Sequence, residues 1–452
     1  MALSGIQIFQ KLPKDNCKEC GLPTCMAFAM AVAGGKIEYA RCPRLSEEAR
    51  AFLEDAASPP IRTVEIGTGN RVFRCGGETV LYRHEKTFVN PTGIGVMIYD
   101  DDDAQTNADK IARLDSLQYE RIGTTLSADL LVLGNRSGDT DRFSAFVADV
   151  ASKTDAPLVL AADINTLDVV ATKLSDRRPL LFLNTKNFDE QTLLKLAEIG
   201  KRTGCAVSFR SADLSQTQNG ARILLDAGVK DFVLDAGAAN RREAFEHNVA
   251  VRRIALAKTA KEFGAPTIAF AAELSENADG ELLTAAVLIA KYAGIVVLSD
   301  LQGHTLFPLL LQRLNLFTDP QRPMKTEQGV YEIGKVHDRS PVVVTCNFSL
   351  TYFIVSGEIE ASRVPARLLV VDTDGLSVLT AWAAGKFVGD VIADVVRKQN
   401  LGEALAEKRI ILPGQVAVIK GDLEEELGPE WTVEVGPREA NQLPAFLREN
   451  FE

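Results

Sequence analysis

The stretch PLVLAADINTLDVVATKLSDRRPLLFLN, residues 157–184, begins and ends in short apolar runs, at 157–162 and 179–184. Each run is apolar at successive positions, which is typical of parallel strands that are buried on both faces. The residues between the runs leave room for a helix, and parallel strands need such a crossover because a tight hairpin cannot join them. The stretch therefore predicts one strand–helix–strand unit of a parallel sheet.

The same alternation recurs through the middle of the chain. Further strand-like runs lie at 93–100, 130–135, 206–211, 231–237, 266–272 and 294–300. Helix-period segments separate them, for example TDRFSAFVADVASKT and ENADGELLTAAVLIAKYA. Eight strand–helix units in a row predict an α/β fold, a (β/α)8 TIM barrel that spans residues 93–318.

Polar residues follow most of these strands, at the end where such barrels carry their functional sites. They are Asp100, Asn135, Asp163, Asn184, Arg210, Asp235 and Asp300. Helix N-caps and turns require the same residue types, which favours a structural role for most of them. The acidic run 100–103 is compatible with a divalent cation, but adjacent carboxylates are more often a solvated loop. The four histidines are scattered, and we expect no catalytic residue in this barrel.

Four of the seven cysteines lie in the segment NCKECGLPTCMAFAMAVAGGKIEYARCP, residues 16–43. They are Cys17, Cys20, Cys25 and Cys42. Their spacing is C-x2-C-x4-C-x16-C, and a proline follows the last of them. Three close thiolates with a fourth that returns before a proline are typical of an iron–sulfur cluster. Structural zinc is the alternative, although zinc ribbons usually present two C-x2-C pairs.

The bulk composition limits the class of protein. With 452 residues the chain exceeds a single core and should divide into about two to four domains. The net charge of −11 argues against a nucleic-acid binder, which would present a basic face. We find no amino-terminal targeting signal and no apolar stretch of membrane-spanning length, so the sequence predicts a cytoplasmic protein. The isolated Cys75, Cys205 and Cys346 are then expected to be buried, unpaired thiols.

Three further parts surround the barrel. Residues 1–58 contain the cysteine segment, and residues 59–92 are predicted to be a hairpin linker of short strands and glycine-rich turns. Four more strand-like runs occur in residues 319–452. They lie at 341–347, 367–375, 408–414 and 431–437. Since a helix-period segment follows each run, this part is predicted to be a doubly wound α/β domain.

The predicted strand ends of the carboxyl-terminal domain share a chemical character. They are Thr345–Asn347, Asp372–Gly375, Pro413–Gly414 and Gly436–Pro437. In open α/β sheets, ligands bind beyond the carboxyl ends of the strands. Small, hydroxyl-bearing and glycine residues suit a large flat ligand rich in neutral amides, because they bond amides without burying charge. Each end alone is equally typical of a turn, whereas the four together favour a binding site.

The order of these parts resembles a known family. A cysteine segment NCKECGLPTC…RCP, a (β/α)8 barrel and a carboxyl-terminal α/β domain resemble the large (gamma) subunit of the corrinoid iron–sulfur protein. That family serves the acetyl-CoA synthase/CO dehydrogenase pathway of anaerobes, also called the reductive acetyl-CoA or Wood–Ljungdahl pathway. The resemblance covers the whole chain. It implies a [4Fe-4S] cluster on residues 1–58, held by Cys17, Cys20, Cys25 and Cys42, and a corrinoid (cobamide) on residues 319–452.

The resemblance also implies corrinoid contacts. They are Ser340, Thr345, Cys346, Asn347, Val371, Asp372, Thr373, Asp374, Gly375, Gly414 and Gly436. Many corrinoid domains supply a histidine to cobalt from an Asp-x-His-x-x-Gly motif, and this sequence lacks one. The nearest match, KVHDRS around His337, has neither the spacing nor the glycine. This is consistent with the base-off, His-off cofactor of the family.

A function and partners follow from the same resemblance. The family carries a methyl group on cobalt, taken from methyltetrahydrofolate through a separate methyltransferase and delivered to acetyl-CoA synthase/CO dehydrogenase. A low-potential cluster returns an electron to cobalt that has become oxidised. A smaller barrel subunit covers the other face of the corrinoid in a heterodimer.

Two other functions stay open from the residues alone. An iron–sulfur electron-transfer adaptor would use the barrel and the carboxyl-terminal domain only to dock redox partners. A barrel hydrolase or methyltransferase with an accessory cluster is disfavoured, because the barrel ends offer no convergent acid–base residues.

Overall fold

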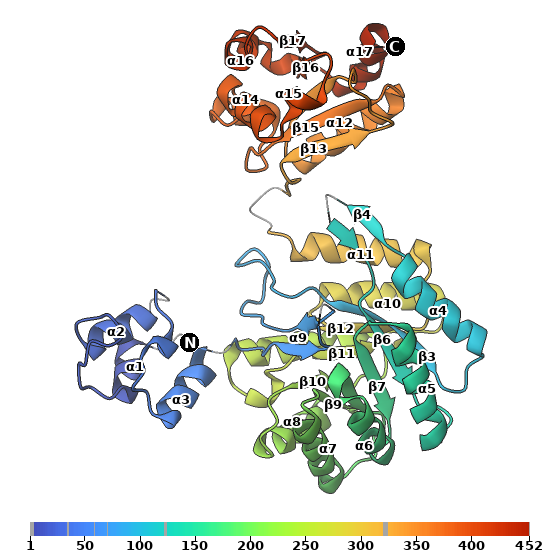
Figure 1. The fold of residues 1–452 in the computed structure, drawn as a ribbon. Coiled ribbons are helices and arrows are strands. Elements are labelled where there is room, and N and C mark those ends of the chain that lie inside the picture. The colour runs from blue at the N-terminus through green and yellow to red at the C-terminus, as the bar shows by residue number, and fades with distance from the viewer. Residues whose placement is uncertain are drawn as a thin grey trace. The chain divides into compact units, whose positions relative to one another are not determined.

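The computed structural model describes residues 4–33, 36–57, 59–69, 71–121, 124–319 and 324–451 (Figure 1). The chain divides into two compact units, one of residues 1–117 and 127–317 and the other of residues 118–126 and 318–452. The first unit contains the cysteine segment and a barrel, and the second contains a five-stranded sheet. Within the described ranges, no helix has both the length and the apolar character needed to cross a membrane.

Eight parallel strands close into a barrel in the order β10-β11-β12-β3-β6-β7-β8-β9. The strands are β3 Gly93–Tyr99, β6 Leu130–Gly134, β7 Leu158–Ala162, β8 Leu180–Leu183, β9 Val207–Phe209, β10 Phe232–Asp235, β11 Thr267–Phe270 and β12 Ile295–Leu298. The helices are α4 Ala104–Ser116, α5 Thr140–Lys153, α6 Ile164–Lys173, α7 Glu190–Thr203, α8 Leu214–Asp226, α9 Arg241–Ala257, α10 Ala278–Ala290 and α11 Gly303–Phe317. Nearly every strand residue is buried, as expected for strands covered on both faces. The predicted (β/α)8 barrel is confirmed.

Short polar side chains begin most of the barrel helices. Asp163 accepts the backbone N–H groups of Asn165 at 2.9 Å and Thr166 at 3.2 Å at the start of α6. Asp213 accepts the N–H group of Gln216 at 2.8 Å at the start of α8. These caps satisfy amide groups that have no partner inside the helix. For Asp163 the structural role expected from the sequence is confirmed.

The hairpin predicted for residues 59–92 forms between β1, Val64–Ile66, and β2, Phe73–Cys75. Its inward side chains have no exposure and pack in one cluster with barrel-interior residues such as Leu130 and Val159. The N–H group of Gly67 donates to the carbonyl of Arg178, which lies just before a barrel strand. The hairpin therefore closes the amino end of the barrel, and this part of the predicted hairpin linker belongs to the barrel core.

The second unit is a sheet in the order β13-β15-β14-β16-β17. Its strands are β13 Gly329–Ile333, β14 Val342–Cys346, β15 Ala366–Val371, β16 Arg409–Leu412 and β17 Thr432–Val435. Its helices are α12 Ser349–Ser362, α13 Val378–Ala383, α14 Gly389–Lys398, α15 Leu401–Ala404, α16 Lys420–Leu427 and α17 Leu443–Phe451. Helices α12 and α17 pack on one face, and α13, α14 and α16 pack on the other. The doubly wound α/β fold predicted for this part is present.

Three features depart from the prediction. Strand β13 runs antiparallel at the edge of the sheet, and its half-exposed residues carry no signal of a buried parallel strand. A second hairpin forms between β4, Tyr119–Arg121, and β5, Thr124–Leu126. The helix-period segment at 377–399 breaks into α13 and α14 near Gly385, which has a left-handed backbone with φ of 70°.

The cysteine segment belongs to a small domain with three helices, α1 Gly5–Lys11, α2 Cys25–Ala33 and α3 Glu47–Ala57. Its core contains few large side chains, among them Ile8 and Phe28. Cores of this size rarely stabilise a fold without a disulfide or a metal. No disulfide is present, because all seven cysteines are free thiols. A bound metal is therefore the expected source of stability for this domain.

Candidate functional site

The loop that carries the first cysteines turns repeatedly. Lys14, Asn16, Lys18 and Gly21 have φ values of 66°, 50°, 63° and 84°. Left-handed residues that recur at short intervals curl backbone N–H groups toward one side, as at many iron–sulfur sites. Gly21 adopts this conformation without strain because it has no Cβ. The loop is thus shaped to surround an anionic group.

The four predicted ligands lie in this loop and in the segments that follow it. Cys17 and Cys20 lie within it, Cys25 begins α2, and Cys42 follows a short 3-10 turn. Burial raises the pKa of the Cys42 thiol, and negative charge on Cys20, Cys17 and Cys25 raises it further. Among the described residues, no three His, Cys, Asp or Glu side chains already form a complete ligand set. The thiols fit a metal group that would complete their convergence on binding.

Arg44 ties the two ends of the cysteine segment together. Its guanidinium donates to Asp15 at 3.0 Å and also to Glu19. These two carboxylates raise the pKa of Arg44 above its usual range. The bridge holds the chain that follows Cys42 against the loop around Cys17.

A second candidate site lies in the five-stranded sheet, where its winding reverses. From β14 the chain crosses to β15 on one side, and it then passes over β14 to reach β16 on the other side. The carboxyl ends of β14 and β16 therefore border a topological switch point, the usual place for ligands in open α/β sheets.

A cavity of about 400 Å³ opens at this point. Thr345 from β14 and Gly436 after β17, two of the residues expected to contact a corrinoid, line it. A whole corrinoid exceeds this volume, so the cavity could hold only part of such a ligand. One hydroxyl group marks the site as polar and incomplete: Thr345 is 1% exposed, and its side-chain oxygen has no hydrogen-bond partner. Unpaired buried hydroxyls are costly, which is the pattern expected where a ligand supplies the partner.

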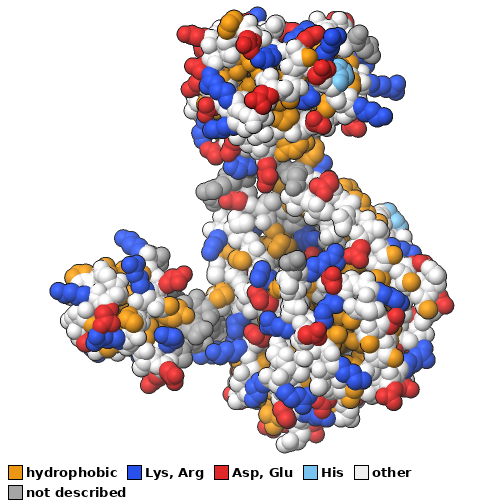
Figure 2. All heavy atoms as spheres, in the orientation of Figure 1, with side chains coloured by type: hydrophobic (Ala, Val, Ile, Leu, Met, Phe, Trp, Pro, Cys, Tyr) orange, Lys and Arg blue, Asp and Glu red, His pale blue; other side chains and the backbone are white. Residues whose placement is uncertain are grey.

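Exposed apolar side chains surround the same edge of the sheet. They are Leu350, Ile354, Leu379, Trp382, Val418 and Val435. All lie at or just after the carboxyl ends of strands, and they are all the exposed large hydrophobic residues that the structure describes in this unit. Hydrophobic surface is visible on this unit in Figure 2. One of them, Ile354, also lines the cavity.

Asn347 and the loop after β15 have a different role from the cavity residues. The Asn347 side chain accepts the N–H groups of Thr373 at 3.0 Å and Gly375 at 2.9 Å, and it donates to Asp372 at 2.7 Å. Asp374 pairs with Lys386, which lowers the pKa of that carboxyl. Because these groups satisfy one another, they fix the shape of the loop and do not line the cavity.

The remaining predicted contacts are dispersed. Cys346 is fully buried in the core on the opposite face of the sheet, beneath α13 and α14. Gly414 lies close to the chain after β17, where an added Cβ would come within 2.5 Å of the Gly436 carbonyl. Ser340 precedes β14 at the opposite edge of the sheet and accepts the N–H group of His337 at 3.0 Å. The structure does not bring Ser340 near the cavity.

Several lining residues were not predicted. Thr351 and Ile354 come from α12, Ser377 precedes α13, and Arg438 and Asn441 precede α17. They lie on helices and loops, so only the packing of those elements onto the sheet brings them to the cavity. The one available signal was position, because each follows a strand end within a few residues.

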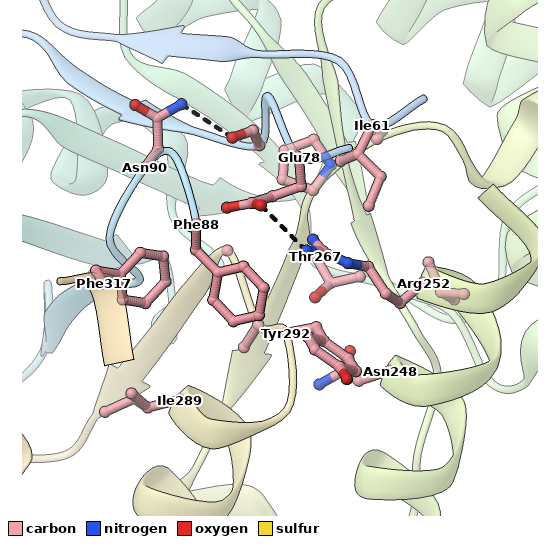
Figure 3. Close-up of a pocket in the computed structure, with 16 residues that line it drawn as sticks. Ile61, Glu78, Phe88, Asn90, Asn248, Arg252, Thr267, Ile289, Tyr292 and Phe317 are labelled. Carbon is pink, nitrogen blue, oxygen red and sulfur yellow. Dashed lines mark hydrogen bonds and ion pairs between the residues drawn. The ribbon is translucent and has the colours of Figure 1, made fainter. Parts of the chain in front are cut away.

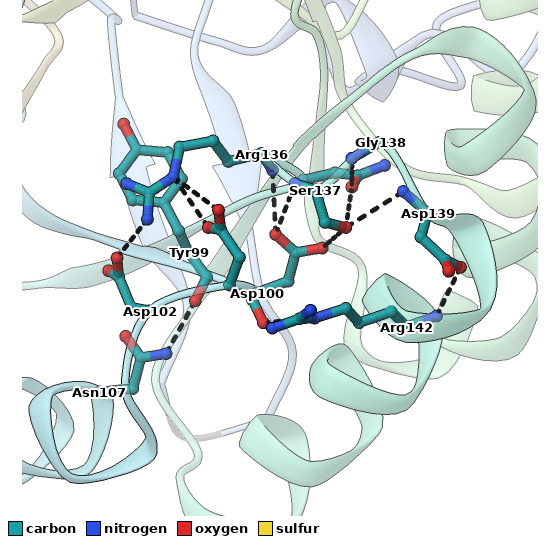
Figure 4. A network of polar contacts seen from close by, with 11 residues as sticks. Tyr99, Asp100, Asp102, Asn107, Arg136, Ser137, Gly138, Asp139 and Arg142 are labelled. Atoms are coloured by element: carbon teal, nitrogen blue, oxygen red, sulfur yellow. Dashed lines mark hydrogen bonds and ion pairs between the residues drawn. The ribbon is translucent and has the colours of Figure 1, made fainter.

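At the carboxyl mouth of the barrel, the acidic run 100–103 is fully engaged (Figure 4). Asp100 accepts the backbone N–H groups of Arg136 at 3.0 Å and Ser137 at 3.1 Å. Asp101 and Asp102 both pair with the Arg136 guanidinium, which stacks 4.2 Å from the ring centroid of Tyr99. Every partner is an arginine, amide or hydroxyl donor, which gives this run a structural role.

Asp235 differs from those carboxylates, because burial raises its pKa to about 6. The folded chain therefore holds this proton more tightly than the unfolded chain, and the carboxyl destabilises the fold as pH rises from about 4 to 6. We expect Asp235→Asn to leave stability unchanged near pH 4 and to raise it by about 1–2 kcal/mol at pH 7.5, a figure reduced for partial exposure. Hydrogen exchange of barrel-strand amides at both pH values measures this, with Asp213→Asn as the control. Equal stabilisation at both pH values would contradict a raised pKa.

Comparison with known proteins covers the whole chain. It is 41% identical over 453 residues to the corrinoid/iron-sulfur protein large subunit of Moorella thermoacetica, a match that spans 100% of this chain and 99% of that protein. The chain belongs to the corrinoid/iron-sulfur protein large-subunit family. It is also 33% identical over 459 residues to the acetyl-CoA decarbonylase/synthase complex subunit gamma of Methanothermobacter thermautotrophicus, which spans 99% of each chain. The gamma subunit of Methanopyrus kandleri is 31% identical, with 98% of this chain and 97% of that protein covered.

Two family models match separate parts of this large subunit. The family "CO dehydrogenase/acetyl-CoA synthase delta subunit" matches residues 63–447, and the family "Putative Fe-S cluster" matches residues 12–44. The second range contains all four predicted ligands. The delta-subunit family does not extend over the cysteine segment, whereas the large and gamma subunits match from end to end. The full-length matches therefore decide which subunit family this is.

Proposed function

We propose that this large subunit carries a methyl group on a corrinoid held by its carboxyl-terminal sheet, and that a [4Fe-4S] cluster on its four cysteines keeps the corrinoid active. The observation that carries the proposal is the cavity at the switch point, with its unpaired Thr345 hydroxyl, in a member of this family. When bound, the corrinoid would supply cobalt that accepts and donates the methyl group, and the cluster would supply single electrons to cobalt that has become oxidised.

The residues of the sheet suit the periphery of a corrinoid, which is rich in neutral amides. The hydroxyl group of Thr345, which lines the cavity, would gain a hydrogen bond to such an amide. Gly436 is required by packing at the edge of the cavity, because an added Cβ would come within 2.9 Å of the Ile411 side chain. None of the four histidines lines the cavity, which supports a cofactor without a histidine ligand.

The proposal includes partners of stated kinds. A smaller barrel subunit would cover the exposed apolar side chains of this unit and shield the outer face of the corrinoid. A methyltetrahydrofolate:corrinoid methyltransferase would supply the methyl group, and acetyl-CoA synthase/CO dehydrogenase would receive it. The names of the archaeal relatives, which are subunits of the acetyl-CoA decarbonylase/synthase complex, support such an assembly.

The direct test is metal analysis of the anaerobically purified complex. We expect about one cobalt and about four iron per large subunit, with matching acid-labile sulfide. Stoichiometric zinc without sulfide would remove the cluster from the proposal. Iron and sulfide without cobalt would instead support an electron-transfer adaptor.

A substitution at the cavity tests where the corrinoid lies. Thr345→Val keeps the shape of the side chain and removes its hydroxyl, so we expect cobamide affinity to fall about 3–10-fold, the worth of one hydrogen bond. The stability of the cofactor-free chain should not fall, because that hydroxyl is unpaired without a ligand. Titration with a cobamide, followed by visible absorbance, measures the affinity. Thr432→Val on exposed β17 is the control, and equal affinities of the two variants would place the corrinoid elsewhere.

A further inference from the structure

Unpaired buried polar groups gather at a second place, the carboxyl mouth of the barrel. Ser208, Arg210 and Ser211 each have a buried side-chain nitrogen or oxygen without a hydrogen-bond partner. They account for three of the ten such atoms among the described residues, and all three come from one short segment at the end of β9. Because most buried polar groups in folded proteins are paired, a local cluster of unpaired ones requires an explanation.

Two of these residues, Arg210 and Ser211, line a cavity of about 280 Å³. Ser211, which is 1% exposed, lines this cavity together with Asp235 from β10 and Lys186 from the loop after β8. Asp235 accepts the backbone N–H group of Gly237 at 3.0 Å. A carboxylate has about four acceptor positions, so Asp235 keeps capacity for further donors.

Arg210 occupies the floor of the mouth but is not available to pair with Asp235. Its guanidinium forms a two-bond ion pair with Glu273, and it lies 5.2 Å and 4.5 Å from the ring centroids of Phe182 and Phe270. These contacts hold the cation between two aromatic rings. The Arg210 cation is therefore fixed in place at the mouth. The Asp235 carboxylate and the Ser211 hydroxyl line the same cavity and can still form further hydrogen bonds.

The two sides of the mouth contrast sharply in hydrogen bonding. On the side of β3, the network around Arg136 in Figure 4 satisfies each carboxylate of the acidic run. On the side of β9 and β10, backbone N–H groups of Gly237 and Ser211 donate to Asp235, and burial raises the pKa of this carboxyl although the charge of nearby Arg210 lowers it. Asp235 is a buried carboxyl that lowers stability when it ionises, and it lies in the same cavity as the unpaired Ser211 hydroxyl. This combination is typical of a binding site rather than of a packed core.

We propose that the carboxyl mouth of the barrel is a second small-molecule site, distinct from the cavity in the sheet. Its ligand is a small, flat molecule that presents two adjacent N–H donors to Asp235, as an amidine or a cyclic amide does. Ser211 bonds the same edge of the ligand, and the Arg210–Glu273 pair with Phe270 forms the wall beside it. Carboxylates bind paired N–H donors through two parallel hydrogen bonds, which provides both affinity and orientation.

Benzamidine is a suitable probe, because it presents two N–H donors on a flat ring. The experiment titrates the purified full-length chain, with its cofactor content unchanged, by isothermal calorimetry. Benzoate has the same shape and lacks the donors, so it should not bind at this site. We expect Asp235→Asn to weaken benzamidine binding about 10–100-fold, as for the loss of a charge-assisted pair.

Asp213→Asn is the matched control, since it removes one carboxylate at the same end of the barrel while an asparagine still caps α8. Its affinity for benzamidine should stay within about twofold of the parent value. Absence of benzamidine binding at millimolar concentration, or equal binding by the two variants, would overturn the proposal. A high-resolution crystal structure that shows only ordered water on Ser208, Ser211 and Asp235 in the presence of benzamidine would also overturn it.

Discussion

Replacement of Arg252 by methionine is expected to lower the free energy of unfolding of the barrel by about 3–5 kcal/mol. Arg252 lies on α9 and donates to Glu78 at 3.1 Å (Figure 3). It also donates to the Val80 carbonyl at 2.7 Å and 3.0 Å. Its guanidinium also lies 5.2 Å from the ring centroid of Phe88 and 4.9 Å from that of Tyr292.

The size of this effect follows from burial. The side chains of Arg252 and Glu78 are 4% and 8% exposed, so removal of the cation leaves a carboxylate that is buried and unpaired. The double variant Arg252→Met/Glu78→Gln should therefore recover part of the loss, because the stranded charge is gone. Hydrogen exchange of the barrel-strand amides measures each variant separately from the other unit.

The matched control lies on the same helix. Arg242 forms an exposed ion pair with Glu246 one turn along α9, so Arg242→Met should change stability by less than about 0.5 kcal/mol. Suppose that Arg252→Met lowered the free energy of unfolding no more than Arg242→Met. The buried ion pair would then not be the contact that holds the segment after the hairpin to the barrel.

This ion pair also explains why the packing of residues 59–92 against the barrel could not be predicted from the sequence. Short strands and glycine-rich turns correctly predicted a hairpin, since those signals are local. The contacts that bind the segment to the barrel, Glu78 with Arg252 and Gly67 with Arg178, join residues more than a hundred positions apart. No local pattern reports such contacts, so a segment built into the core was interpreted as a linker.

The barrel was predictable for the opposite reason. Its strands are buried on both faces, and such strands appear in sequence as uninterrupted apolar runs, such as the one at 157–162. Strand β13 is half exposed and antiparallel, and it was missed because it lacks that run. The fold was thus predictable where burial is complete and was not where an element meets solvent.

The lining residues of the candidate site in the sheet were also predictable only in part. Thr345 and Gly436 were predicted because ligands bind at strand ends, whereas Thr351 and Ser377 reach the cavity from helices whose packing the sequence does not reveal. Asn347 lies at the predicted edge but uses its amide to anchor the loop at Thr373 and Gly375. An amide has both donors and acceptors, so residue type alone could not separate a ligand contact from an anchor.

The second large effect is expected at the cysteine loop. Cys20→Ser replaces one of the four proposed cluster ligands with a poor ligand for iron. Because metal affinity depends strongly on the complete ligand set, we expect cluster content to fall below about one-tenth of the parent value. If the cluster supplies electrons to oxidised cobalt, reductive reactivation should slow at least about 100-fold. Methyl transfer to a corrinoid that has been reduced beforehand should stay within about twofold of the parent rate.

The two readouts separate the roles of the two sites, because the cysteines and the sheet belong to different units of the chain. Cys205→Ala is the control: that thiol is buried in the barrel, and its loss should leave iron content and reactivation unchanged. Electron paramagnetic resonance and iron analysis report the cluster, and stopped-flow absorbance reports each cobalt reaction. Loss of methyl transfer from pre-reduced cobalt in Cys20→Ser, with cobamide still bound, would mean that the cluster takes part in the transfer itself. Unimpaired reactivation without a cluster would mean that the electron reaches cobalt by another path, and the cysteines would then serve only to stabilise their domain.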